Sequence, residues 1–259
     1  PVELFKEAEL IRARGVGITG GDPLVDVERC CNYVKLLKKK FGRKFHVHLY
    51  TPLLLVDVKR LKLLADAGVD EIRFHPNLDD DSLWHKLSLA RKFDWKVGIE
   101  IPVVPGFEKR ILKLVDFAVG KIDFLNLNEL ELSDTSVSHY GLSEKFVAKS
   151  DLSYGVKGSE LLGKKILEYC AKKGLPAHFC SAKLKDSVQV SKRLARRAVN
   201  VALPYEKITK DGTIVRGCVY LKDSVPSFGY RKRLSDVNKV PLIEVLCAVK
   251  KDLVAKGFF

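Results

Sequence analysis

Short runs of β-branched and other apolar residues alternate, over the first two thirds of the chain, with longer stretches in which apolar residues recur at helical spacing. The short runs predict strands, and the longer stretches predict amphipathic helices of roughly ten to seventeen residues. The predicted strands are Gly15–Thr19, Phe45–Thr51, Glu71–His75, Lys96–Val103, Ile122–Asn128 and Ala177–Cys180. This alternation is typical of βα units around a parallel sheet.

Residues typical of helix starts and stops lie between these elements and agree with the pattern. A helix start is indicated by the acidic run that ends in Ser82, and helix stops are indicated by Gly42, Gly68 and Gly174. There are six such units, and no glycine-rich turn of the dinucleotide-binding type joins a strand to a helix. The sequence therefore predicts an α/β fold of the partial (βα)₆ TIM-like barrel type, with ligand chemistry at the carboxyl ends of the strands.

The regular alternation ends after the fifth predicted strand. The segment Glu131–Val156 is rich in Ser and poor in periodicity, which predicts a loop over the mouth of the barrel. After Ser181 the sequence predicts a basic helix, Lys185–Ala198. We therefore expect two domains, a partial barrel over residues 1–182 and a basic extension over residues 183–259.

The basic extension has its own elements. Asp211-Gly212 lies between two alternating apolar runs, Val201–Thr209 and Thr213–Lys222, and Asp-Gly in such a position is a strong hairpin signal. A last amphipathic stretch, Pro241–Lys256, predicts a closing helix.

Composition excludes several classes of protein. With 259 residues, of which 46% are apolar, the chain is long enough to bury a full core. It has no apolar run long enough to span a membrane and no signal-peptide pattern, so we expect a cytoplasmic protein. It contains no Met and opens within a helical pattern at Pro1–Ala8, from which we expect further residues upstream.

Net charge changes this picture in the second half of the chain. The formal net charge is +14, and residues 157–259 hold 22 Lys+Arg against 9 Asp+Glu, whereas residues 1–156 are nearly balanced. Such asymmetry predicts an anionic partner for the C-terminal part, with RNA, and tRNA in particular, as the first expectation. A solvated Lys-rich face is an equal alternative. The residues expected to meet the partner are Lys183, Lys185, Lys192, Arg193, Arg196 and Arg197, with a second patch at Tyr230–Arg233.

The most specific motif follows the first predicted strand, where Gly20-Gly21-Asp22-Pro23 leads into a helix. Paired glycines expose backbone groups to a ligand, and Pro fixes the turn. This stretch resembles the Gly-Gly-Glu-Pro motif of radical SAM enzymes, with Asp22 in place of Glu. The resemblance is greatest to an uncharacterised archaeal-type branch related to pyruvate formate-lyase activating enzyme.

Three later strands carry the resemblance further. His46–Thr51 resembles the family's next strand, Gly98–Gly106 resembles a strand whose end contacts SAM, and Phe124–Glu129 resembles the last core strand. The resemblance implies an enzyme that uses S-adenosyl-L-methionine (SAM) and a [4Fe–4S] cluster to generate a deoxyadenosyl radical. It also implies a one-electron donor such as ferredoxin or flavodoxin. The residues expected at SAM are Gly20, Gly21, Asp22 and Pro23 beside methionine, Thr51 and Glu100 at the ribose or carboxylate, and Ile101 and Asn126 at the adenine.

One departure from the family is severe. The Cys-x-x-x-Cys-x-x-Cys loop, whose thiolates hold the cluster, does not occur among Cys30, Cys31, Cys170, Cys180, Cys218 and Cys247. Because the family places this loop and its strand before the Gly-Gly motif, we expect both to lie upstream of Pro1. The chain itself then supplies no cluster ligand.

Other candidate residues have competing interpretations. Cys180 ends a strand and is a candidate catalytic thiol, although a small buried filler is the commoner role of such a residue. His46 and His48 share a strand face, and either line the barrel or, as the less favoured alternative, bind metal. Glu129 and Glu131 either face the mouth or form a solvated edge.

Two alternatives to RNA modification remain at this stage. One is activation of a partner protein by glycyl-radical formation. The other is a cluster-free barrel that binds nucleic acid, in which the Gly-Gly turn is only structural. Three upstream cysteines at the family spacing would separate the enzymes from the binding module.

Overall fold

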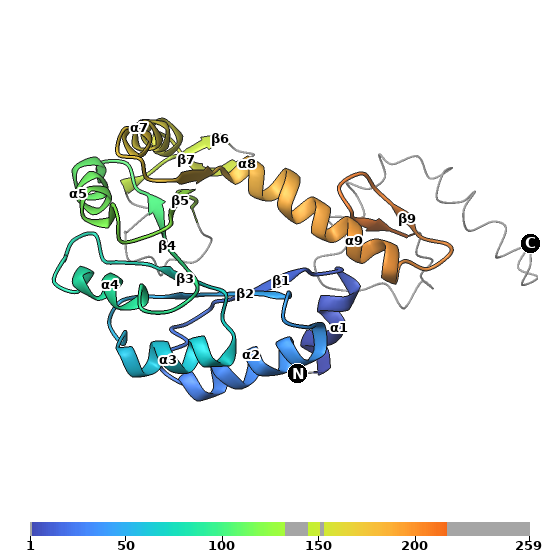
Figure 1. The fold of residues 1–259 in the computed structure, drawn as a ribbon. Helices are drawn as coiled ribbons and strands as arrows, with labels where there is room; N and C mark the ends of the chain where they lie inside the picture. Colours follow the sequence, from blue (N-terminus) through green and yellow to red (C-terminus); the bar gives the residue numbers. More distant parts are fainter. Residues whose placement is uncertain (1, 133–144, 151–152, 217–259) are drawn as a thin grey trace, which may run out of the picture. The chain divides into compact units, whose positions relative to one another are not determined.

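The computed structural model describes residues 2–132, 145–150 and 153–216, and contains a six-stranded parallel sheet (Figure 1). The strands lie in the order β1-β2-β3-β4-β5-β8, and every neighbouring pair is parallel. Their bounds are β1 Gly15–Ile18, β2 His46–Thr51, β3 Glu71–Phe74, β4 Lys96–Val103, β5 Phe124–Glu129 and β8 Ala177–Cys180. The order never reverses, as expected for a singly wound barrel and not for a doubly wound sheet. The predicted α/β fold is confirmed.

Helices connect the strands and cover one face of the sheet (Figure 1). Their apolar residues pack with Leu49, Ile72 and Ile99, all at 0% exposure, in one continuous core. The helical segments are α1 Val2–Leu10, α2 Val27–Phe41, α3 Val58–Ala67, the 3₁₀ turn Trp84–Lys86 followed by α4 Leu87–Ala90, α5 Glu108–Ala118 and α7 Ser159–Lys172. Asp26 and Asp57 cap α2 and α3 by accepting backbone N–H groups, as N-cap carboxylates commonly do.

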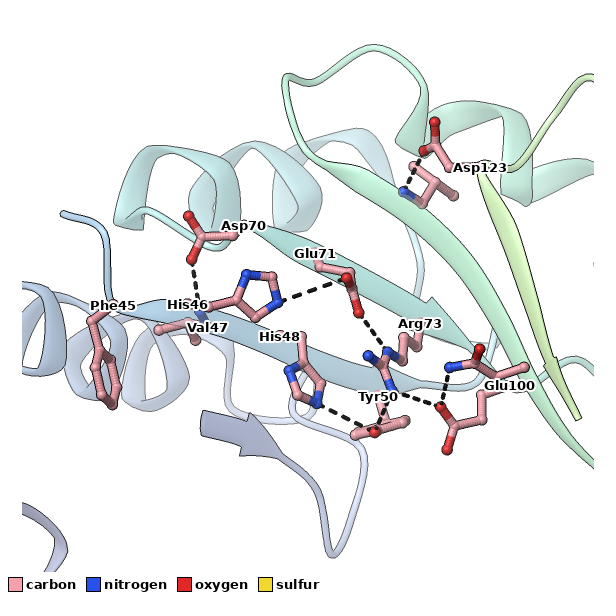
Figure 2. A network of polar contacts seen from close by, with 12 residues as sticks. Phe45, His46, Val47, His48, Tyr50, Asp70, Glu71, Arg73, Glu100 and Asp123 are labelled. Carbon is pink, nitrogen blue, oxygen red and sulfur yellow. Dashed lines mark hydrogen bonds and ion pairs between the residues drawn. The ribbon is translucent and has the colours of Figure 1, made fainter. Parts of the chain in front are cut away.

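Carboxylates fix the register at the amino ends of the strands. Asp70, just before β3, accepts the N–H of Val47 in β2 at 2.6 Å, and Asp123, just before β5, accepts the N–H of Val97 in β4 at 2.8 Å. Figure 2 shows the contact between Asp70 and Val47. The same device therefore joins two pairs of neighbouring strands at the edge opposite the expected ligand site.

The segment predicted as a loop, Glu131–Val156, contains structure that its sequence did not reveal. It includes β6 Ala148–Ser150 and β7 Ser153–Val156, which pair antiparallel, and Glu131 bridges to Gly155. Buried Glu129 helps to hold β6 in place, because its carboxylate pairs with Lys149 of β6 and accepts the Ala182 N–H at 2.8 Å. Residues 133–144 and 151–152 lie outside the described part.

Contact density divides the chain into two compact units, one of residues 1–9 and 13–188, the other of residues 10–12 and 189–259. The basic segment is helical, but it passes from α8 Ala182–Leu184 through a π-helical stretch, Lys185–Val190, into α9 Ser191–Val201. It therefore starts earlier than predicted and is not one regular helix. The division at residue 182 stays a prediction.

The predicted hairpin is present in the second unit with shorter strands, β9 Lys207–Ile208 and β10 Ile214–Val215. Its turn closes through the Thr209 N–H, which donates to the Thr213 carbonyl at 2.9 Å. Tyr230–Arg233 and Pro241–Lys256 lie outside the described residues. Within the described residues, no helix is long and apolar enough to cross a membrane.

Candidate functional site

The face of the sheet that is turned away from the helices is lined with polar side chains. Residues two apart in a strand share a face, so the pairing register identifies this set of neighbours. It comprises His46, His48 and Tyr50 of β2, Glu71 and Arg73 of β3, Glu100 of β4, and Asn126 and Asn128 of β5. We call these residues the inner-face network.

Glu100 and Arg73 are the centre of the inner-face network (Figure 2). One Glu100 carboxylate oxygen accepts from Arg73 at 2.8 Å and from Asn126 at 3.1 Å, and the other accepts from Asn128 at 2.9 Å. Arg73 also donates to Glu71 at 2.5 Å and to the Tyr50 hydroxyl at 2.9 Å. A single chain of contacts thus links four neighbouring strands.

The network keeps its charged groups ionised although they are largely buried. Burial alone would raise the pKa of Glu100, but hydrogen bonds from Asn128 and Asn126 and the nearby Arg73 hold it below the ordinary value. Burial, reinforced by the Arg73 charge, lowers the pKa of His48 to about 4. Near neutral pH the face therefore carries charged Glu100 and Arg73 beside a neutral His48.

The Gly20-Gly21 turn lies at the carboxyl end of β1. Both glycines are exposed, Gly20 has a φ of +105°, and a Cβ built on either one meets no atom within 4 Å. The turn is therefore open to solvent, and its backbone groups are accessible to a ligand. Gly15 and Gly17 precede Gly20 at the spacing of a dinucleotide fingerprint, but both lie inside β1 and not in a turn.

Asp22 ties the turn to the neighbouring strand. One of its carboxylate oxygens accepts the Thr51 hydroxyl at 2.7 Å and the Leu24 N–H at 3.0 Å. Thr51 is the last residue of β2 and is buried. The structure therefore brings together two residues expected at SAM, and it shows that Asp22 holds the turn in place.

The other residues expected at SAM form a second group. Glu100 and Asn126 touch each other on the inner face, three residues before the ends of their strands. Ile101 points the opposite way, into the core at 0% exposure, so only its backbone is available to a ligand. Pro23 follows the Gly-Gly turn and is half-buried.

Sequence reasoning missed Arg73, Tyr50 and Asn128. The signal that could have found them is the alternation of side chains between the two faces of a strand. Once the register between strands is known, the polar residues at every second position share a face with Glu100. The register itself depends on strand pairing, which the linear pattern does not state.

The cysteines test the fit to an iron–sulfur cluster. Cys30, Cys31 and Cys170 belong to the apolar core, and burial raises the pKa values of the Cys30 and Cys170 thiols to about 11. Cys180 ends β8 beside Asn128 on the inner face and is 8% exposed. These four described cysteines do not form the ligand set of a [4Fe–4S] cluster.

The acidic pair after β5 divides into two roles. Glu129 is 3% exposed and is therefore not a solvated edge residue. Glu131 is half-buried and pairs with Lys185 at 2.6 Å, within the first unit. The positive charge of Lys185 is thus already offset, whereas Lys183 is exposed.

The remaining basic candidates lie on α9 in the second unit. Lys192 and Arg196, like Arg193 and Arg197, are one helical turn apart. Arg196 Nε donates to the Ile11 carbonyl at 2.8 Å. This side chain therefore has a structural contact, and the expected role of these four residues at an anionic partner stays a prediction.

No family model matches the chain. Among solved structures, likenesses include the tryptophan synthase α₂β₂ complex of the hyperthermophile Pyrococcus furiosus, at 15% identity over 76% of this chain and 87% of that one, and the A-subunit from the same organism, at 14% identity over 74% and 86%. Both have a TM-score of 0.37. At this level they support neither a fold nor a function.

A curated relative is far more similar in sequence. The chain is 42% identical over 225 residues to a "Putative glycyl-radical enzyme activating enzyme" of Methanocaldococcus jannaschii. The match covers 83% of this chain and 59% of that protein, so the chain spans less than two thirds of its relative. The resemblance predicted from the Gly-Gly motif and its companion strands is thus confirmed as a similarity to this one protein.

Proposed function

We propose that this chain binds SAM at the carboxyl ends of its parallel strands and belongs to a radical SAM enzyme that activates a glycyl-radical enzyme. The observation that carries the proposal is the open Gly20-Gly21 turn, held against β2 by the bond between Asp22 and Thr51. The relative's name supports the choice of a protein target over RNA.

In this proposal the chain's own residues bind and orient SAM. The backbone of Gly20 and Gly21 receives the methionine moiety, while Asp22 and Pro23 keep the turn in position. Glu100 and Asn126 offer polar groups to the ribose and adenine from the inner face, and the backbone of Ile101 lies beside them. SAM and a reduced cluster, if bound here together, would supply the radical chemistry that removes a hydrogen atom from the substrate.

The [4Fe–4S] cluster and its electron donor rest on the family relationship alone. Because the described cysteines do not fit the cluster, its ligands are not proposed among them. Cys180 remains a candidate substrate-side thiol, since it shares the inner face with Asn128.

SAM binding can be tested with two glycine variants that each place a side chain at a residue with positive φ. Gly20 and Gly42 have φ values of +105° and +88°, and a Cβ at either position meets no atom within 4 Å. Each change to Ala should cost on the order of 1–3 kcal/mol of stability, but only Gly20→Ala alters the proposed SAM-binding turn. Calorimetric titration of the full chain with SAM should show at least tenfold weaker binding for Gly20→Ala, and unchanged binding for Gly42→Ala. Equal affinities for the two variants would contradict the site.

Activity requires a separate experiment. The protein used must also carry the upstream cysteine loop that the family resemblance implies, because the described cysteines do not fit the cluster. After anaerobic reconstitution with iron and sulfide, that protein should release deoxyadenosine from SAM when a reductant is added. The Gly20→Ala variant should release less at subsaturating SAM and should recover as SAM is raised. A protein that binds SAM and holds a cluster, yet releases no deoxyadenosine, would rule out the radical chemistry while leaving the binding site intact.

RNA modification gains no support from the comparisons. The geometry also weakens its basis, because Lys185 is paired with Glu131 and Arg196 contacts a backbone carbonyl. We therefore propose a protein target and not RNA.

A further inference from the structure

Two histidines and a glutamate converge on the inner face below the expected SAM site. His46 and His48 alternate on β2, and Glu71 of β3 is the register partner of His48. Each of the three offers a ligand atom, and these atoms all lie within 4.8 Å of one another. Figure 2 shows His46 facing Glu71, and His48 beside them with its ring directed toward Tyr50.

His48 has an unmet requirement in this cluster. Its Nδ1 atom is buried and has no hydrogen-bond partner among the described residues, while its Nε2 lies 3.3 Å from the Tyr50 hydroxyl. A buried polar atom without a partner costs free energy, and such atoms often mark the place of an ion or water. A metal ion bound by the His48 imidazole would offset this free-energy cost, although the ion is not a hydrogen-bond donor.

Glu71 is oriented for the same role. Arg73 donates to Glu71 Oε1 at 2.5 Å, which leaves Oε2 facing His46 Nε2 at 3.7 Å. Tetrahedral ligands at about 2.0–2.1 Å from a zinc ion are about 3.4 Å apart, so small side-chain rotations close the difference. Contacts that orient a ligand in this way are typical of the shell around a metal site.

The neighbouring strand packs closely against the cluster, with the His48 ring lying over Gly17. Gly15 and Gly17 of β1 pair with His46 and His48, and a Cβ on Gly17 would lie 2.6 Å from His48 Nε2. The His46 side chain is 44% exposed, which gives an ion a route from solvent.

The surrounding charge is compatible with a cation. The charged groups that face the cluster are Glu71, Arg73 and, beyond it, Glu100, and Arg73 bonds to both carboxylates. Two negative charges and one positive charge leave a net negative charge for a divalent ion to offset.

We propose that His46, His48 and Glu71 bind a divalent transition-metal ion of the zinc type, with at least one coordination position open toward the inner face. Two imidazoles and one carboxylate are a ligand set that binds Zn²⁺ and leaves a site for water or another ligand. The site uses no thiolate and is separate from the proposed SAM-binding turn and from any iron–sulfur cluster. Its existence does not depend on the proposed function.

The experiment is a titration of the full chain with Co²⁺, produced without a histidine tag and freed of metal beforehand. Co²⁺ replaces Zn²⁺ and reports its ligands by visible absorption, and thiolate ligands add a separate near-ultraviolet band. We expect one Co²⁺ per chain, displaced by Zn²⁺, without the thiolate band. His46→Ala and Glu71→Gln should each weaken binding at least about tenfold. The control is His85→Ala, because His85 is exposed and contacts the Ser82 carbonyl at 2.8 Å, outside the cluster.

Folding is measured in parallel, so that loss of binding is not confused with loss of structure. His46 is half-exposed, and the metal-free His46→Ala variant should retain the helical circular dichroism of the parent chain. Zn²⁺ should raise the urea midpoint of the parent and of His85→Ala, but not that of His46→Ala. The proposal is overturned if the parent chain binds no Co²⁺, if the thiolate band accompanies binding, or if His46→Ala and Glu71→Gln bind as tightly as the parent.

Discussion

The two faces of the six-stranded sheet differ sharply in chemistry although they are made by the same strands. Toward the helices the strands present Leu49, Ile72, Ile99, Leu125 and similar residues, all at 0–1% exposure. On the other side lies the inner-face network of charges and amides. One face is stabilised by apolar burial and the other by paired polar groups. Adjacent residues of a strand face opposite sides of the sheet, so they are stabilised in these two different ways.

Three consecutive residues of strand β4 show this difference between the two faces. Ile99 and Ile101 are buried among the helices, and Glu100 between them contacts Arg73 and two asparagines. Neighbouring residues of one strand therefore contribute to stability by different physical means. The four substitutions below test this difference.

The largest effect is expected on the helix-facing side. Ile99→Ala removes a side chain with 0% exposure from the middle of the core and should cost about 2–5 kcal/mol in the free energy of unfolding. Urea denaturation measures this cost. Leu54→Ala, at a side chain that is 68% exposed, is the control and should change stability by less than about 0.5 kcal/mol. A cost below about 1 kcal/mol for Ile99→Ala would mean that this face is not the core.

A smaller, pH-dependent effect is expected from the adjacent inner-face residue. Glu100→Gln removes the charge that Arg73 and two amides satisfy and should cost about 2 kcal/mol at pH 7. The folded pKa of Glu100 lies below its ordinary value of 4.5, so the ionised group stabilises the fold above that pH. The stabilisation is lost as the pH falls through the folded pKa.

Urea denaturation of both proteins at pH 7 and in acid checks this sign. The difference between parent and Glu100→Gln should be full at pH 7 and should shrink below pH 4.5. A difference that stays constant over this range would show that the Glu100 charge does not stabilise the network.

A third substitution tests the link between the Gly-Gly turn and the sheet. Thr51→Val keeps the side-chain shape but removes the hydroxyl that donates to Asp22 at 2.7 Å, and should cost about 1 kcal/mol. Asp22 then retains only the Leu24 N–H at the same oxygen. SAM titration should show weaker binding if the turn depends on this bond. Unchanged stability and unchanged SAM affinity would remove Thr51 from the site.

The smallest effect belongs to the outer surface of the helices. Lys62 and Asp66 form an exposed pair on α3 at 2.9 Å, with side chains 65% and 59% exposed. Lys62→Ala should change the free energy of unfolding by less than about 0.5 kcal/mol, and the change should vanish in high salt. A larger cost would show that this exposed ion pair contributes substantially to the free energy of unfolding.

The fold followed closely from the linear pattern because helix and strand periods are local properties. Lys96–Val103 and Ala177–Cys180 match their predicted bounds, and β2 differs by one residue. The hairpin formed by β6 and β7 was missed, because it is held by long-range contacts such as that of Lys149 with buried Glu129. A Ser-rich segment carries no local sign of such a partner.

The sequence by itself determined the βα order, the stop glycines Gly42 and Gly68 and the Gly-Gly turn, since each depends on residues near one another in the chain. The tertiary structure decided which residues share a site. Asp22 reaches Thr51, Arg73 reaches Glu100, and His46 and His48 meet Glu71 only because parallel pairing fixes the register between strands more than twenty residues apart. Register is set by packing and hydrogen bonding across the whole sheet, and the linear pattern does not contain it.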